Sequence, residues 1–279
     1  MTVLILVLGL GYLGWLHPAG DSFAVFRVQA ATALATLATV CLVLRNRLLG
    51  EVGLVVATLA GAPLLLDYQQ AGVAGDWRLY QKNMLFRNDD LPGLEADIRA
   101  MDPDVLTLQE VSSQNQPLLA ALADVLPGQV YCPFLQVGGT AVATRWPVVA
   151  GSETCTMGLS ALQAEMPAGR VWLVSIHMHW PWPYRQTSHL QSLLPVLQQL
   201  EGPVVVAGDF NMVPWSAALA AIRAAARVKP AGPVRGTFPE FGPLFVLPID
   251  QVMAPGGASL ELRPLFGSDH RGLLARFDF

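Results

Sequence analysis

Three apolar runs without a single Asp, Glu, Lys or Arg lie within the first 66 residues, at 1–16, 28–44 and 52–66. Each is shorter than the roughly 20 residues that a membrane helix needs, but neighbouring apolar residues can lengthen it. Only 14% of the chain is charged, against about 25% in a typical soluble domain. We therefore predict three transmembrane helices in a membrane region at 1–66. Two alternatives stay open: a hydrophobic soluble core and, for the first run, a cleaved signal peptide, although that run lacks a basic start.

The distribution of arginines predicts how these helices cross the membrane. Arg45 and Arg47 lie between the second and third runs, whereas the loop between the first and second holds Arg27 and Asp21. Because loops rich in basic residues tend to stay in the cytoplasm, the chain after the third run is expected on the other side. This predicts an integral protein of the cell inner membrane whose larger part is extracytoplasmic, in the periplasm.

Two of the three cysteines follow the apolar region, at Cys132 and Cys155. A disulfide between them needs an oxidising compartment, which agrees with the extracytoplasmic placement. Two unpaired buried thiols are the alternative.

After a short linker at 67–77, the region 78–279 alternates between strand-like and helix-like stretches. Mixed strands and helices in this number favour a layered α/β domain. Strands are expected at 77–85, 104–111, 139–149, 170–180, 203–210, 245–254 and 270–279, and helices at 91–102, 116–126, 186–200 and 215–228.

Polar side chains follow several of these strands at the point where each strand ends. In "VVVAGDFN", Asp209 and Asn211 are two residues apart and so point to one side if the strand continues. Gly208 before them allows a close approach of backbone or ligand. A turn that caps the strand is the alternative interpretation. Other strands end in Asn83, in Glu110 and in the pair His177 and His179, whereas Asp250 lies within "PIDQV". The last strand is preceded by Ser268, Asp269 and His270, and a sheet that brings its strand ends together would gather all these groups in one cleft.

These residue types support phosphoester hydrolysis. Asn83 and Glu110 offer the hard oxygen ligands that suit Mg²⁺ or Mn²⁺. Asp250 and His270 could form a general base in which the carboxylate orients the ring. His177 and Asn211 could stabilise charge that develops on a phosphoryl oxygen.

In this order the motifs resemble those of the endonuclease/exonuclease/phosphatase superfamily, with its deoxyribonuclease-like fold, and point to a membrane-anchored bacterial-type member. The matching stretches are "KN", "DVLTLQEV", "GTAVATRWPV", "VSIH", "VVVAGDFN", "PIDQV" and "GSDHRG". The resemblance covers about residues 78–279 and implies a two-sheet α/β sandwich with the site at one end. It also implies one or two Mg²⁺ or Mn²⁺ ions and a divalent-metal-dependent phosphoesterase acting on phosphodiester or phosphomonoester bonds.

The resemblance implies a role for each matching residue. Glu110 would be the main metal ligand, with Asn83 beside it and Asp269 near the ion. His270 would activate water and be oriented by Asp250. Asp209 would orient the nucleophile or hold a second ion, and Asn211 and His177 would contact the scissile phosphate.

Several alternatives remain at this stage. His177 and His179, spaced two apart, could instead bind Zn²⁺. The loop "HWPWPY" is either a rigid surface loop or a substrate-facing lip formed by His179, Trp180, Trp182 and Tyr184. A formal net charge of −4 gives no support to a nucleic-acid partner, so a lipid-borne phosphoester is favoured, although a nuclease stays open. The last alternative is a non-catalytic module that binds a phosphate ligand.

Overall fold

Two six-stranded sheets stack face to face in the computed structural model, which describes residues 1–242 and 245–279. Hydrogen-bonded neighbours in the first sheet follow the order β11 (Ala258–Arg263), β12 (Gly272–Phe277), β1 (Trp77–Asn83), β2 (Val105–Val111), β4 (Gly138–Thr144) and β3 (Gly128–Leu135). The second sheet has the order β5 (Thr154–Thr156), β6 (Leu159–Met166), β7 (Gly169–His177), β8 (Val204–Asp209), β10 (Asp250–Ala254) and β9 (Lys229–Pro230).

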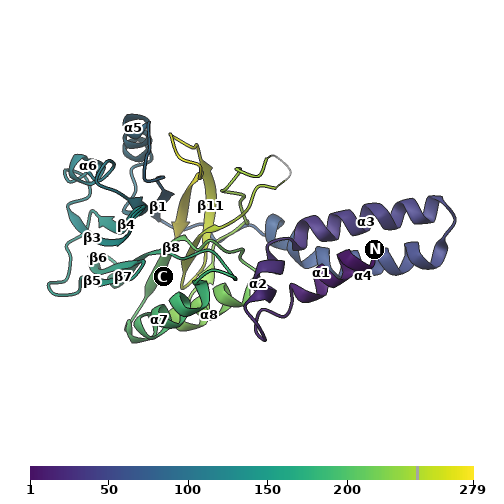
Figure 1. The fold of residues 1–279 in the computed structure, drawn as a ribbon. Helices are drawn as coiled ribbons and strands as arrows, with labels where there is room; N and C mark the ends of the chain where they lie inside the picture. Colours follow the sequence, from purple (N-terminus) through teal and green to yellow (C-terminus); the bar gives the residue numbers. More distant parts are fainter. Residues whose placement is uncertain (243–244) are drawn as a thin grey trace.

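Alternation of side chains along the strands builds three apolar layers. Leu79 of β1 and Val205 of β8 point between the sheets and belong to one buried cluster. Tyr80, next to Leu79, faces outward toward the helices α5 (Leu91–Met101) and α6 (Pro117–Ala121). The outer face of the second sheet is covered by α7 (Gln186–Gln199) and α8 (Ala217–Ala226). Figure 1 shows these helix pairs on opposite sides of the sheets. The predicted two-sheet α/β sandwich is confirmed.

The N-terminal region forms a helical projection beside the sandwich (Figure 1). It comprises α1 (Thr2–Leu10), α2 (Ala19–Ala24), α3 (Arg27–Val43) and α4 (Arg47–Gln69), with α3 and α4 packed as a hairpin. Among the described residues, α4 is the one helix that is both long and apolar enough to cross a membrane. The expectation of three transmembrane helices is therefore not supported.

The first apolar run falls short for a local reason. A helix of nine residues, the length of α1, rises about 14 Å, less than half of a bilayer core. The helix ends at Leu10 because Gly11 and Gly14 follow within the run and Pro18 lies just after it, and glycine and proline disfavour a continuing helix.

The stretch between α1 and α3, residues 11–26, packs onto the sandwich, and we call it the docking segment. The Asp21 carboxylate accepts hydrogen bonds from the backbone N–H groups of Ala217 (2.8 Å) and Ala218 (2.9 Å), the first residues of α8. A carboxylate at a helix N-terminus is favourable because it satisfies free N–H groups. The indole of Trp215 donates to the carbonyl of Ala24, 2.8 Å away, and Ala24 is fully buried in the core. Contacts thus cross the division expected between 1–66 and the later domain.

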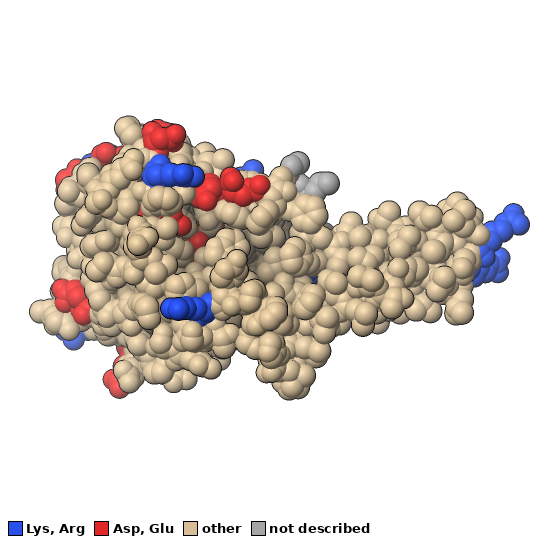
Figure 2. All heavy atoms as spheres, in the orientation of Figure 1, with Lys and Arg blue, Asp and Glu red and all other residues tan. Residues whose placement is uncertain are grey.

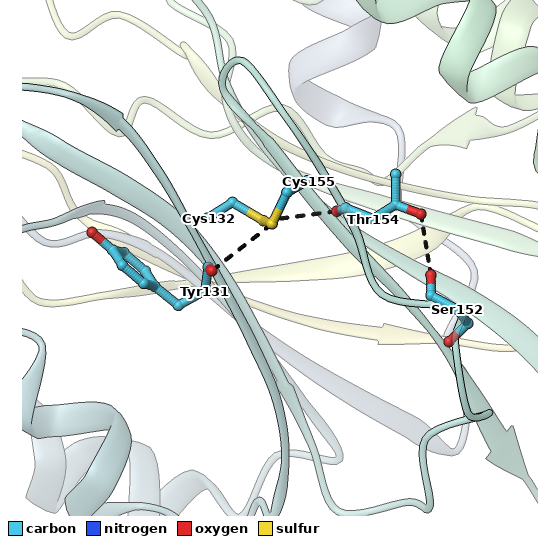
Figure 3. Close-up of a disulfide and its surroundings, with 5 residues drawn as sticks. All are labelled: Tyr131, Cys132, Ser152, Thr154 and Cys155. Atoms are coloured by element: carbon cyan, nitrogen blue, oxygen red, sulfur yellow. Dashed lines mark hydrogen bonds between the residues drawn. A yellow bond between two sulfur atoms is a disulfide. The ribbon is translucent and has the colours of Figure 1, made fainter.

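A disulfide joins Cys132 of β3 to Cys155 of β5, as Figure 3 shows. It links an edge strand of the first sheet to an edge strand of the second. Of the two alternatives that the sequence leaves open for these cysteines, the structure has the disulfide, and Cys41 in α3 is free.

Candidate active site

Strand direction gathers the predicted site residues at one edge of the sandwich. β1 runs parallel to β2 in the first sheet, and β7 runs parallel to β8 in the second. Their carboxyl ends carry Asn83, Glu110, His177 and Asp209. β12 and β10 run antiparallel to these strands, so they begin where the others end, and they bring His270 and Asp250 to the same place.

His270 and Asp250 form a buried pair. The ring Nδ1 of His270 lies 2.7 Å from Asp250 Oδ2. The other carboxylate oxygen of Asp250 accepts a hydrogen bond of 2.9 Å from the Gln81 side-chain amide. With Asp250 held on both oxygens, the ring is oriented so that its Nε2 faces Asp209, whose Oδ2 is 3.8 Å away.

Asp209 lies at the centre of the group. Asn83 donates its side-chain amide to Asp209 Oδ2 at 2.9 Å, and the backbone N–H of Asn211 donates to Oδ1 at 2.8 Å. His177 Nε2 is 3.6 Å from Oδ2. The Asn211 side chain donates to the carbonyl of Met178, so Asp209 and Asn211 do lie together, as their spacing predicts.

Burial sets the protonation states of these groups. It lowers the pKa of His177 to about 3, and the charge of His270 adds to the effect, so His177 is neutral at pH 7. Burial also raises the pKa of Asp209 to about 7, although His270 opposes it. For His270, burial alone would lower the pKa, but the carboxylates of Asp250 and Asp209 outweigh it and raise the value to about 9.

Two further carboxylates lie close to this group. Glu110 Oε2 accepts the Phe86 backbone N–H at 2.9 Å, and Oε1 accepts from the Asn83 amide at 3.3 Å. Burial raises the pKa of Glu110, and the nearby charge of Asp269 adds to this. Asp269 Oδ1 is buried, with no hydrogen-bond partner in the described part of the chain. An unpaired buried carboxylate oxygen next to a second carboxylate is costly unless a cation neutralises it.

These donors fit a hard divalent cation. Asp209, Asp250 and His270 also have ligand atoms within 4.8 Å of one another, so the arrangement could hold a metal. Within that trio, His270 Nδ1 and Asp250 Oδ2 are engaged with each other, and the metal-ligand roles of Glu110 and Asp269 stay predictions. Asn83 uses its oxygen to accept the Leu85 N–H, and its predicted place in the metal shell stays a prediction.

The backbone has positive φ angles at or directly before two of these side chains. Glu110 has φ +56° and lies where the register between β2 and β4 shifts, which is the local kink of a β-bulge. Gly208 has φ +152°, and a Cβ there would collide with the Ile176 carbonyl of β7. Glycine thus lets β8 approach β7 directly before Asp209.

The predicted lip divides into two parts. The ring of His179 packs 4.9 Å from the ring of the buried His189 and 5.3 Å from that of Phe134. Phe134 in turn lies 6.0 Å from the ring of His177. His189 is bonded on both ring nitrogens, to the Met157 carbonyl and the His179 backbone N–H. Among the described residues, no third ligand joins His177 and His179, so the zinc alternative gains no support. Trp180, Trp182 and Tyr184 are exposed.

Sequence reasoning missed a layer of residues behind the site. Gln81 donates to both Asp250 and Gln109, and Gln109 donates to the Ser175 hydroxyl. Gln109 within the mostly apolar "VLTLQEV" was the available signal for this buried chain of hydrogen bonds. The ring of Phe238 lies 4.7 Å from that of His270.

Lys82 was missed as well. Its ammonium group donates to the backbone carbonyls of Leu265 (2.6 Å) and His270 (2.5 Å). The buried lysine thereby fixes the turn that carries Asp269 and His270 into β12.

Comparison with solved structures identifies the fold. A protein of the endonuclease/exonuclease/phosphatase family from Leptotrichia buccalis superposes with a TM-score of 0.58 at 15% identity, covering 73% of this chain and 100% of that one. A Staphylococcus aureus beta toxin variant with bound magnesium ions gives 0.54 at 12% identity, with 73% and 100% coverage. Sphingomyelinase C from Streptomyces griseocarneus gives 0.50 at 17% identity, with 72% and 99% coverage. At these identities the likeness shows the fold alone.

No curated protein matches the chain. The model of the Endonuclease/Exonuclease/phosphatase family, in contrast, matches residues 80–270, the whole span from β1 to the His270 pair. The chain therefore belongs to this family, whose members are metal-dependent hydrolases of phosphoester bonds.

Proposed function

We propose that this protein is a membrane-anchored, divalent-metal-dependent phosphodiesterase in which the His270–Asp250 pair activates water. The observation that carries the proposal is the 2.7 Å contact between His270 Nδ1 and Asp250 Oδ2, buried beside Asp209 and the unpaired Asp269 oxygen. A histidine oriented by a carboxylate is a common general base.

The proposed reaction is an attack of water on phosphorus. His270 Nε2 takes a proton from the water, Asp250 stabilises the imidazolium that forms, and Asp209 orients the nucleophile. The new P–O bond forms as the ester P–O bond breaks. The leaving alkoxide takes a proton from solvent and departs as the alcohol, and His270 returns its proton to solvent. Neutral His177 and the Asn211 amide would donate hydrogen bonds to the phosphoryl oxygens.

A cation held by Glu110 and Asp269, with Asn83 or Asp209 completing the shell, would neutralise phosphoryl charge and lower the pKa of His270 toward neutrality. Oxygen ligands favour Mg²⁺ or Mn²⁺ over softer metals.

Membrane anchoring is supported by the surface of the hairpin. Only 28% of the most apolar 18-residue stretch of α4 is buried. Large side chains such as Val55, Leu59 and Leu66 are mostly exposed. A core helix of a soluble protein would be mostly covered, so this surface favours a lipid environment. Figure 2 shows the hairpin tan along almost all its length and blue at its outer end, where Arg45 and Arg47 lie.

The far-side placement of the sandwich rests on two observations. Basic residues at the hairpin tip favour a cytoplasmic tip, and the Cys132–Cys155 disulfide favours an oxidising compartment for the sandwich. We therefore propose that the protein lies in the inner membrane with its active site in the periplasm, which agrees with both observations.

The experiment uses the full chain purified in detergent. We expect hydrolysis of bis(p-nitrophenyl) phosphate with Mg²⁺ or Mn²⁺, loss of it with EDTA, and a fall of about 100-fold or more in His270→Asn. Val125→Ser, at an exposed position, is the control for effects of mutation and purification that do not involve the site. Full activity in His270→Asn would remove the proposed base. A folded, magnesium-binding protein without activity on any phosphoester would favour the non-catalytic binding module.

A further inference from the structure

The docking segment contacts the rim of the active site as well as α8. Ser22 donates its hydroxyl to the carbonyl of Trp182 at 2.6 Å, and the ring of His17 lies 6.1 Å from that of Trp182. Val25 packs against Phe238 and Ile249, and Ile249 directly precedes Asp250. The segment that leads into the hairpin is thus fixed against the loops that border His270.

Those loops present exposed aromatic side chains, which we call the aromatic rim. Trp180 packs on Phe238, which packs on both His270 and Phe241. The rim therefore begins at the ring of the catalytic base and runs outward to solvent. Its members and their exposed fractions are Trp180 (40%), Trp182 (48%), Tyr184 (67%), Phe241 (60%) and Phe245 (39%).

The aromatic rim meets the base of the hairpin through the contact of Trp182 with His17, and exposed apolar side chains precede His17 in the chain. There Tyr12, Trp15 and Leu16 are exposed, Trp15 to 73%. Tryptophan and tyrosine favour the boundary between lipid and water because they combine an apolar ring with a polar group. Arg185, exposed next to Tyr184, adds a cation of the kind that contacts lipid phosphates.

The length of the hairpin determines where this surface lies relative to the bilayer. The 23 residues of α4 rise about 34 Å, close to the roughly 30 Å of a bilayer core. With Arg45 and Arg47 on the cytoplasmic side, the other end of α4 reaches the opposite membrane surface. The sandwich meets this end of α4, since the Val234 N–H bonds to the Asp67 carbonyl and Tyr68 packs 6.1 Å from Trp215. The docking segment lies here too, because the Trp215 indole bonds to the Ala24 carbonyl.

We propose that the aromatic rim rests on the surface of the bilayer that holds the hairpin, and that the site hydrolyses the phosphoester of a lipid in that membrane. The inference rests on the proposed function and names its substrate class. Because the docking segment is bonded to both α8 and Trp182, the sandwich is held with its rim toward the lipid. A nucleic acid would instead need a cationic surface, which a chain of net charge −4 with an aromatic rim does not favour.

The first test measures where the rim lies, independently of catalysis. In a Cys41→Ser background, Tyr184→Cys and Val125→Cys are each labelled with an environment-sensitive fluorophore and placed in vesicles of phosphatidylethanolamine and phosphatidylglycerol. Val125 is exposed and follows α6 on the opposite sheet, so it is the matched control. We expect lipid-borne quenchers to act on the label at 184 and aqueous iodide to act on the label at 125. Equal iodide quenching at both sites, or protection of 184 from both quenchers, would overturn the proposal.

The second test compares substrates in the same preparation. Vesicles that contain phosphatidylglycerol, phosphatidylethanolamine and sphingomyelin are assayed for released phosphate ester, against plasmid DNA and bis(p-nitrophenyl) phosphate. We expect the ratio of lipid to soluble-ester hydrolysis to fall about tenfold in the double variant Tyr184→Ala/Phe241→Ala, because two interfacial anchors are lost. Hydrolysis of the soluble ester without any lipid hydrolysis would sink the lipid proposal alone. If the parent protein hydrolyses none of these substrates, including the soluble ester, the proposed function itself is wrong.

Discussion

Asp250 Oδ2 lies 2.7 Å from His270 Nδ1 at the start of β10, directly across the sheet from Asp209 at the end of β8. Antiparallel pairing thus places the carboxylate that orients the base beside the one that would orient the nucleophile. Burial alone would raise the pKa of Asp250, but the charge and hydrogen bond of His270 outweigh it and lower that pKa. Asp250 is therefore ionised when His270 carries a proton.

We expect Asp250→Asn to lower kcat by about 100-fold or more and to leave KM nearly unchanged. Asparagine keeps the shape of the side chain but cannot stabilise the imidazolium. Steady-state kinetics on bis(p-nitrophenyl) phosphate measure this, with the exposed Asp124→Asn as a control. A change in KM alone would assign Asp250 to substrate binding.

Asp269 provides a test of the metal site that does not depend on activity. Its buried Oδ1 lacks a partner among residues 1–242 and 245–279, and its charge repels Glu110, so Asp269→Asn relieves repulsion in the metal-free protein. We expect the metal-free melting temperature to stay equal or to rise, while the rise caused by Mg²⁺ is largely lost. Differential scanning calorimetry with and without Mg²⁺ measures both values. An undiminished Mg²⁺ effect would place the ion elsewhere.

Much of the sandwich and of the site could be predicted because local signals encode it. Short runs that end in polar residues marked β1, β2, β7 and β8, and "PIDQV" marked β10, which begins at Asp250. Their common edge follows from strand direction. Hairpin partners such as β6 and β11 were missed because "LSALQAEM" and "ASLELR" are short and mixed in polarity, with no strong periodicity.

The contacts of the docking segment could not be predicted, for a different reason. Asp21 and Ala217 are 196 residues apart, and nothing in "PAGDSFA" shows that its carboxylate will meet the N-terminus of α8. The Gln81–Asp250 contact, across 169 residues, is of the same kind. Such pairs arise from tertiary packing, which one sequence does not reveal.

The disulfide gives a stability prediction that also bears on location. It closes a loop of 23 residues between β3 and β5, and such a loop contributes about 3 kcal/mol. We expect Cys132→Ser/Cys155→Ser to lower the free energy of unfolding by about that amount, measured by denaturant titration. The Cys41→Ser variant, which removes the free thiol, is the control. A double variant as stable as the parent protein would remove the disulfide as an argument for an oxidising compartment.

The last prediction concerns pH and an ion pair away from the site. Asp97 of α5 accepts from the Tyr80 hydroxyl at 2.7 Å and from two nitrogens of the Arg263 guanidinium, Nε at 3.1 Å and Nη2 at 2.5 Å. Burial alone would raise the pKa of Asp97, but the bonds from Arg263 and Tyr80 outweigh it and lower that pKa below its ordinary value. The carboxylate form therefore stabilises the folded state.

Because the folded-state pKa lies below the unfolded value of about 3.9, this stabilisation is complete above that pH and is lost as pH falls through the folded value. We expect Asp97→Asn to cost about 1–3 kcal/mol at pH 7 and the gap from the parent protein to close below about pH 4. Glu261→Gln removes the other, exposed partner of Arg263 and should cost under about 0.5 kcal/mol. Urea titrations from pH 7 to pH 3 measure all three proteins, and a gap that is constant with pH would mean that Asp97 acts by packing rather than by charge.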